Sequence, residues 1–126
     1  MKITLKDVNA FNKMYPKLAD KPLPLPVAYK LAKLYKVLSS DIEFFNSKMS
    51  DYIKHYAMKD EQGKLIFSPD GTGIKIAPEN VDECNQKIHE LEEMDVQAPN
   101  CTFSLDEFGN ISFTPNEISV LLPFIG

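Results

Sequence analysis

The chain has 126 residues, and its proportions of apolar (44%) and charged (25%) residues are those of an average soluble protein. This composition excludes wholesale disorder, and the length suits one domain, residues 1–126, with a single core. No apolar run approaches the roughly 20 residues of a membrane span. The first residues also lack the apolar stretch of a signal peptide. We therefore expect a cytoplasmic protein without a membrane partner.

All 14 basic residues are lysines, and 18 acids bring the net charge to −4. The absence of arginine and the negative charge argue against an arginine-finger enzyme and against sequence-specific nucleic-acid binding. Residues 1–59 hold 11 lysines and 5 acids, whereas residues 60–126 hold 3 lysines and 13 acids. Two packed elements that attract each other would explain this division, and so would two faces of opposite sign that steer partners.

The N-terminal segment, residues 1–19, is expected to form a short helix. Thr4 can cap this helix, with Asp7 as its capping partner. Pro16 disfavours a helical conformation at the preceding residue, so the helix should end near Tyr15. The alternation over residues 1–5 also fits a short strand. The apolar face of the helix consists of Leu5, Val8, Phe11 and Tyr15.

Residues 20–26 carry three prolines at alternate positions, which favours an extended connector with Leu23 and Leu25 packed against the core. Residues 27–59 contain neither glycine nor proline, and their apolar residues recur every 3.5 positions on average. This pattern predicts one continuous helix, with a weak point at residues 39–41. Further apolar side chains require a second covering neighbour: Leu34, Phe44 and Ile53. Aromatic side chains at helical spacing indicate core packing rather than base stacking: Tyr29, Tyr35, Phe44, Phe45, Tyr52 and Tyr56.

The second half of the chain should fold back along this helix. Residues 60–78 fit a β-hairpin with its turn at residues 68–73, and residues 79–96 fit an acidic helix antiparallel to the long one. Residues 101–105 and 111–113 fit two short strands. Thr114, Pro115 and Glu117 then give a strong start signal for a helix over residues 115–122.

The predicted fold class is therefore α+β, with a long antiparallel helical hairpin, a small antiparallel β element and a short C-terminal helix. The helical hairpin with its β-hairpin tip occupies residues 27–97. The β element and the C-terminal helix occupy residues 98–126.

No constellation of residues points to catalysis, a cofactor or a metal. The only histidines are His55 and His89, and Cys84 lies on the apolar stripe of its predicted helix, where a thiol is usually inert packing. Cys84 and Cys101 lack zinc or redox spacing. We predict a non-enzymatic protein without a cofactor.

The C-terminal tail is too apolar to be left in water. It either covers the second stripe of the long helix or forms a partner surface. Together with the acidic helix it supplies the candidate interaction surface, which consists of Glu90, Glu92, Glu93, Asp95, Leu121, Leu122, Phe124 and Ile125.

Four short stretches carry a family resemblance: the start Met1-Lys2-Ile3, the lysine-rich residues 28–34, the helix exit at residues 59–64, and the ending over residues 113–118 and 121–125. In these stretches the chain resembles small proteins of unknown function encoded by phages and prophages of low-GC bacteria. The resemblance implies a virus-related origin and brings no catalytic residue with it.

We therefore expect a non-enzymatic phage or prophage protein–protein interaction module, acting in virion assembly or as an accessory factor. Its partner would be a viral or host protein, or a second copy of the chain. The expected location is the host cytoplasm, with the virion as an alternative. The alternative function is inhibition of a host enzyme such as a nuclease, with the acidic face presented as a nucleic-acid mimic.

Overall fold

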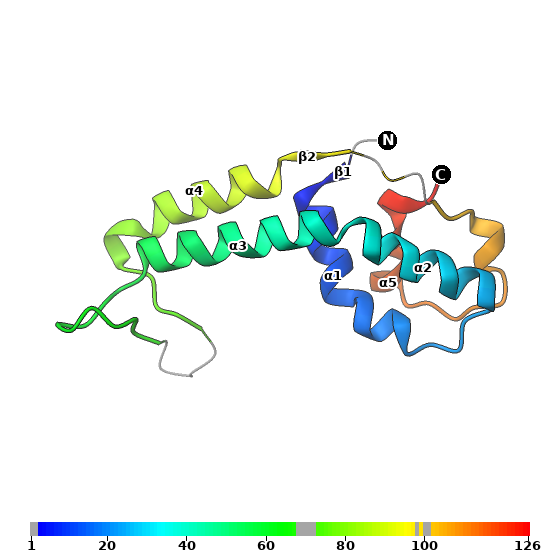
Figure 1. Cartoon of the computed structure of the whole chain (residues 1–126), viewed down its shortest axis with the longest axis horizontal. Coiled ribbons are helices and arrows are strands. Elements are labelled where there is room, and N and C mark those ends of the chain that lie inside the picture. The colour runs from blue at the N-terminus through cyan, green and yellow to red at the C-terminus, as the bar shows by residue number, and fades with distance from the viewer. Residues whose placement is uncertain (1–2, 68–72, 98, 100–101) are drawn as a thin grey trace.

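The computed structural model describes residues 3–67, 73–97, 99 and 102–126. Within these residues the protein is mostly helical, with five α-helices and one two-stranded antiparallel sheet (Figure 1). In the same residues, no helix combines the length and the apolar character that crossing a membrane requires. The elements are β1 (Ile3–Thr4), α1 (Leu5–Ala19), α2 (Leu25–Val37), α3 (Ser39–Tyr56), η1 (Pro78–Asn80), α4 (Val81–Glu92), β2 (Asp95–Val96), η2 (Leu105–Phe108), α5 (Pro115–Leu121) and η3 (Leu122–Phe124).

The N-terminus forms both of the elements that its sequence allowed. Strand β1 pairs antiparallel with β2, and α1 begins directly after it, where the Asp7 carboxylate accepts a hydrogen bond from the Thr4 N–H at 3.0 Å. The predicted end of the helix near Tyr15 is wrong, because α1 continues through Pro16 to Ala19. The extra turn places Leu18 in the core with 1% of its surface exposed. This burial offsets the hydrogen bond that proline cannot donate.

The continuous helix predicted over residues 27–59 is wrong, because the chain forms two helices that meet at Leu38. This residue has φ −84° and ψ −2°, and the Ser39 hydroxyl donates to the Lys36 carbonyl at 2.7 Å. Backbone hydrogen bonds still run from Leu38 to Leu34 and from Ile42 to Leu38, so the break is a bend and not a loop. The bend falls beside the weak point expected at residues 39–41. Beyond the bend, α3 packs on α4 as well as on α1, whereas α2 packs in the main cluster of the core.

The far end of α3 leads into a small β element, which we call the tip (residues 57–67 and 73–77). The expected hairpin is present in the antiparallel pair Phe67–Ile74, but residues 57–59 add a third segment. Met58 donates its N–H to Lys75, Lys75 donates to Ile66, and Ile66 donates to Met58, at 2.8, 2.7 and 3.0 Å. These three residues close a triangle of hydrogen bonds. The expected turn at residues 68–73 lies outside the described residues, apart from Gly73.

Helix α4 packs on α3 and runs back along it in the opposite direction (Figure 1). It ends at Glu92, four residues before the predicted end. The following Asp95 and Val96 form β2 and pair with Thr4 and Ile3. The small sheet therefore joins the N-terminus to the end of the acidic helix, and it is not the sheet expected after residue 98.

The strands predicted over residues 101–105 and 111–113 are wrong within the described part of the chain. Leu105 begins the 3-10 helix η2, residues 111–113 form no strand, and Phe103 makes a single parallel bridge to Ile125. Aromatic packing explains this irregular path, since the Phe108 ring lies 5.4 Å from that of Phe103 and 5.0 Å from that of Phe113. Residue 101 lies outside the described residues. Helix α5 begins at Pro115 as predicted, with Thr114 as its cap, and ends at Leu121, one residue before the predicted end.

Two hydrophobic clusters divide the molecule. The main cluster joins α1, α2 and α5, and its largest fully buried side chains are Phe11, Phe103 and Phe124. The second cluster is smaller and consists of the buried residues Leu5, Phe45 and Leu91. We call the lobe around the main cluster the head (α1, α2, η2, α5 and η3). We call the extension from it the arm (α3, the tip and α4).

Candidate functional site

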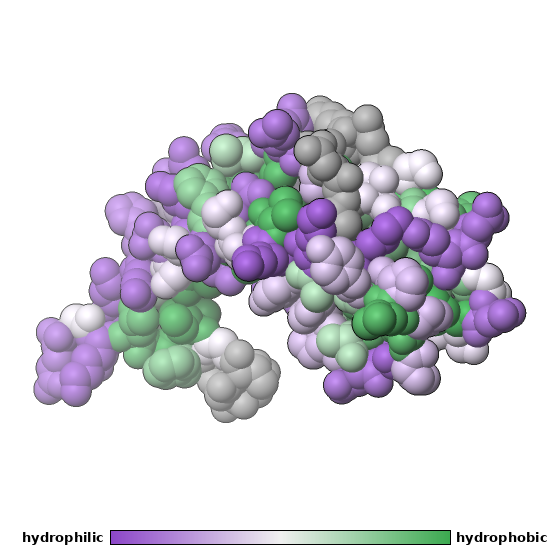
Figure 2. Space-filling model, turned by 45° about the vertical axis from the view of Figure 1, so that its right-hand side comes forward, coloured by the Kyte–Doolittle hydropathy of each residue, from purple (hydrophilic) through white to green (hydrophobic). Residues whose placement is uncertain are grey.

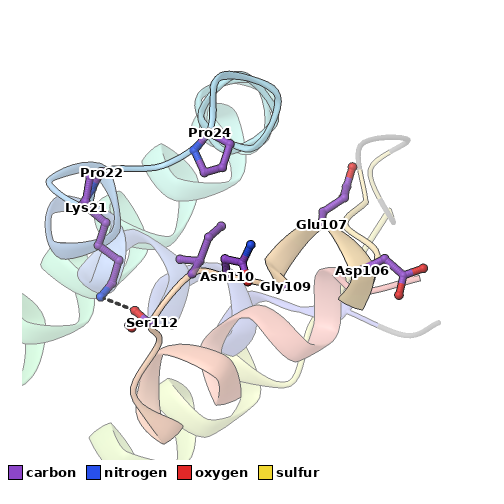
Figure 3. A pocket seen from close by; sticks show the side chains of 9 residues that line it. Lys21, Pro22, Pro24, Asp106, Glu107, Gly109, Asn110 and Ser112 are labelled. Carbon is purple, nitrogen blue, oxygen red and sulfur yellow. Dashed lines mark hydrogen bonds between the residues drawn. The ribbon is translucent and has the colours of Figure 1, made fainter.

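A cleft of about 490 Å³ opens in the head between the proline-rich connector and the loop that follows η2 (Figure 3). The connector contributes Lys21 and two prolines, and the loop contributes polar side chains and backbone. Polar atoms in a concave site are the usual sign of ligand binding. The cleft is lined by Lys21, Pro22, Pro24, Asp106, Glu107, Gly109, Asn110, Ile111 and Ser112.

The ammonium group of Lys21 is already used within the protein. It donates to the Ser112 carbonyl at 3.0 Å, lies 3.1 Å from a Glu117 carboxylate oxygen and sits 5.6 Å from the centre of the Phe113 ring. The hydrogen bond from the Thr114 N–H is the largest cause that lowers the pKa of Glu117; desolvation opposes it, and Lys21 lowers the pKa further. Glu117 is also buried, with 5% of its surface exposed. Lys21 therefore fastens the connector to the start of α5.

A second pair fastens α2 to η2 at the same cleft. Lys30 forms an ion pair with Glu107, whose other oxygen accepts the Ser104 N–H at 2.9 Å. The hydrogen bond from Lys30 and the one from Ser104 lower the pKa of Glu107. A carboxylate held in its ionised form is a poor general acid, and among the described residues no histidine or cysteine lines the cleft. The cleft is thus a joint of the fold, because Lys21 is paired with Glu117 and Glu107 is paired with Lys30.

These two ion pairs also show how the two oppositely charged halves of the sequence meet. Lys21 and Lys30 come from the basic half, and Glu117 and Glu107 come from the acidic half. The attraction expected between packed elements is therefore present. It operates inside the head, however, while the sequence pattern had suggested it between the long helix and α4.

Of the predicted interaction residues of the acidic helix, Glu90 and Glu92 lie in α4, whereas Glu93 follows its end and Asp95 belongs to β2. Glu90, Glu93 and Asp95 are exposed, and Glu92 is half-buried. Lys87 lies 3.8 Å from Glu90, an exposed contact within one helix turn. Exposed pairs of this kind are screened by water and stabilise little. The outer face of α4 is therefore mainly anionic.

The predicted interaction residues of the tail lie on the head, so they form no single surface with the acids of α4. Leu121 and Phe124 are buried, the latter with its ring centre 5.4 Å from that of Phe11. Ile125 is half-buried and Leu122 is exposed. Within the tail, Leu121 and Phe124 are therefore core, and Leu122 presents the larger exposed surface.

The tail does not cover the second stripe of the long helix in the way the sequence suggested. It packs on α1, and Leu34 is buried in the main cluster, whereas Phe44 stays 42% exposed. The ammonium of Lys48 lies 5.9 Å from the centre of the Phe44 ring. Tyr29 is also exposed, so the core packing expected for most aromatic residues of these helices does not extend to Phe44 and Tyr29.

The remaining reactive side chains offer no catalytic arrangement. Cys84 is buried, as its place on the apolar stripe predicted, and this burial raises the pKa of its thiol. Burial, followed by the Glu83 carboxylate, raises the pKa of the Tyr56 phenol. Among the described residues, no three of His, Cys, Asp and Glu are placed to hold a metal ion. Cys101 lies outside the described residues.

A shallow groove on the outer face of α2 was missed by the sequence patterns. We call it the α2 groove; its volume is about 590 Å³ and it is lined by Tyr29, Ala32, Lys33, Lys36 and Val37. Tyr29 is 65% exposed and Val37 49%, and Leu25 at the start of α2 is also exposed. Leu25 was expected to pack down. The sequence did hold one sign of this groove, because Leu25, Tyr29 and Val37 are apolar residues that lie off the stripe of buried side chains on α2.

The surface carries apolar areas at both ends of the molecule. Figure 2 shows apolar atoms on the head and beneath the far end of the arm, each bordered by hydrophilic side chains. Comparison with protein-family models, curated proteins and solved structures finds no match to the chain. The chemistry of the protein therefore has to be sought in its own surfaces, of which the α2 groove and the acidic face of α4 are the most distinctive.

Proposed function

We propose that the protein is a non-enzymatic protein–protein interaction module that binds its partner through the α2 groove. The observation that carries the proposal is the exposure of large apolar side chains beside lysines on a helix face. Tyr29 and Val37 lie in the groove, and Lys33 and Lys36 border it. Protein interfaces combine an aromatic or aliphatic centre with a charged rim. A phage or prophage setting is supported by the sequence resemblance.

The chemistry of the groove favours a protein over a small molecule. The groove is shallow and on the outside of one helix, whereas small ligands are usually held in deep pockets with several converging polar groups. The polar cleft of the head does have converging groups, but Lys21 and Glu107 there are bound to other residues of the protein. Nucleic acid is disfavoured by the net charge of −4.

A photo-crosslinking experiment tests this proposal. A benzoylphenylalanine in place of Tyr29 should form protein adducts in the cell that makes the protein, because this ring would lie within the interface. The same analogue in place of Lys13, which is exposed on α1, is the matched control and should form none. The adducts at position 29 should disappear in the Lys33→Glu, Lys36→Glu background. Absence of adducts at position 29, or adducts insensitive to the two lysines, would contradict the proposal.

The alternative function, inhibition of a nuclease, would use the other distinctive surface. It is favoured by the exposure of Glu90, Glu93 and Asp95 in one region of the arm. A nucleic-acid mimic needs such a run of negative charge. Substitution of Glu90, Glu92, Glu93 and Asp95 by their amides should then abolish competition with DNA for the enzyme, and competition that survives would remove this alternative.

A further inference from the structure

We infer that the α2 groove binds the acidic outer face of α4 on a second copy of this chain, so that the protein assembles head to arm. The inference rests on the proposed function, since it assumes that the groove is an interface. It adds that the molecule bound in the groove is a second copy of the chain. Both complementary surfaces are present in each molecule, and each is exposed.

Charge is the first argument. Helix α2 contains three lysines and no acid, and α4 contains four acids and one lysine. Lys30 is engaged by Glu107 within the head, but Lys33 and Lys36 are exposed at the groove. A surface with this charge attracts a negative helix and repels a positive one, which sets the choice and the register of the partner.

The placement of apolar side chains is the second argument. On α2, Leu25 and Val37 are exposed at the two ends of the helix, with the lysines between them. On the arm, Val81 is exposed at the start of α4 and Met94 is exposed two residues after its end, with acids between them. At 1.5 Å per residue α2 is about 18 Å long from Leu25 to Val37, and α4 is about 17 Å long from Val81 to Glu92. Two helices of this length can therefore match apolar ends to apolar ends and opposite charges to each other.

The geometry of the molecule sets the kind of assembly. Helix α2 lies in the head and α4 lies in the arm, at opposite ends of the structure (Figure 1). The two faces are different surfaces, so a single contact is heterologous, and the bound pair keeps one unused acidic face on the first copy and one unused groove on the second. Such contacts give open chains, or rings where the rotation closes, and the smallest ring is a two-fold pair in which both contacts form.

Light scattering coupled to size exclusion tests the inference on the full chain. The wild-type protein should associate in a concentration-dependent way at low salt, and association should fall as the salt approaches about 0.1 M, where charges are screened beyond about 10 Å. The Lys33→Glu, Lys36→Glu variant and the Glu90→Lys, Glu93→Lys variant should each weaken association at least about tenfold, because like charges would then face each other. Circular dichroism confirms that both variants are folded.

The decisive measurement is an equimolar mixture of the two variants. Each retains one natural face that complements the natural face of the other, and their two altered faces also complement each other, so the mixture should associate where the separate variants do not. The Lys6→Glu, Lys13→Glu variant changes two exposed lysines on α1 and is the matched control, which should associate like the wild type. A mixture that stays monomeric overturns the inference.

Further outcomes separate this inference from the proposed function. A wild-type chain that is monomeric at all concentrations, but whose position-29 crosslinks join it to a different protein, overturns self-association and leaves the groove an interface. Titration with a DNA duplex and with phosphatidylserine vesicles checks the other anionic occupants. Binding of either that requires Lys33 and Lys36, in a chain that stays monomeric, also overturns the inference.

Discussion

The head and the arm are both built from helices, but these helices bury their side chains to different extents. In the head, α1, α2 and α5 surround a cluster in which Phe11 and Phe124 have no exposed surface. In the arm, α3 and α4 form a two-helix hairpin, and Phe45 packs on Leu91 and on Leu5 from α1. A helix in a two-helix hairpin has one covered face, whereas a central helix is covered on several. The comparison indicates that the arm opens locally at a lower free energy than the head.

The largest effect is expected from Phe124→Ala in the head. This side chain is fully enclosed, so its removal leaves a cavity as well as losing burial, and the free energy of unfolding should fall by about 3–5 kcal/mol. Chemical denaturation measures this loss. Leu122→Ala, two residues away on an exposed position, is the control and should change stability by less than about 0.5 kcal/mol. Equal losses for the two variants would show that the tail is not core.

Phe45→Ala tests the arm. Phe45 is 4% exposed and packs between α4 and the start of α1. We expect a loss of about 3 kcal/mol, the lower end of the usual range for this substitution, because the small cluster can partly collapse. Hydrogen exchange should accelerate in α3 and α4 before it does in α1 and α5. Acceleration of the same size in all four helices would mean that the head and the arm open as one unit.

A smaller, pH-dependent effect is expected at Glu117 in the head. Its pKa is lowered from the ordinary 4.5, so the ionised carboxylate stabilises the folded state above that value, and the stabilisation is lost as the pH falls through the lower folded-state pKa. Glu117→Gln should therefore melt at a lower temperature than the wild type at pH 7, and the difference should shrink near pH 3. Glu93→Gln, exposed on the arm, is the matched control and should show no such difference. A constant gap between pH 7 and pH 3 would contradict this assignment.

Local signals in the sequence predicted the starts of elements better than their ends. The caps at Thr4 and Thr114 were predictable because each satisfies its own backbone within four residues. The continuation of α1 past Pro16 was not, because it depends on where Leu18 is buried. The bend at Leu38 was missed for a similar reason, since heptad spacing records which side chains are apolar and not how many neighbours cover them.

The two candidate surfaces also differ in whether the sequence alone predicted them. The acids of α4 were identified from charge alone, since a run of acids on one helix is visible in the sequence. The α2 groove was missed because Tyr29 and Val37 lie off the buried stripe, and the sequence alone does not show whether another element covers them. The role of Lys21 was equally hidden, because its partners Ser112 and Glu117 lie about 90 residues away in the chain.

The triangle of backbone hydrogen bonds at the tip limits how this protein can aggregate. Met58, Ile66 and Lys75 each donate one hydrogen bond and accept one from another member of the triangle. Their N–H and C=O groups are thus unavailable to an incoming strand, although Phe67 beside them is exposed. A hairpin of two strands alone would leave backbone groups unpaired along its edges. Such an edge is a template for β pairing with another molecule. The proposed assembly through helices would therefore leave these three residues at the end of the arm closed to pairing with the strands of another copy.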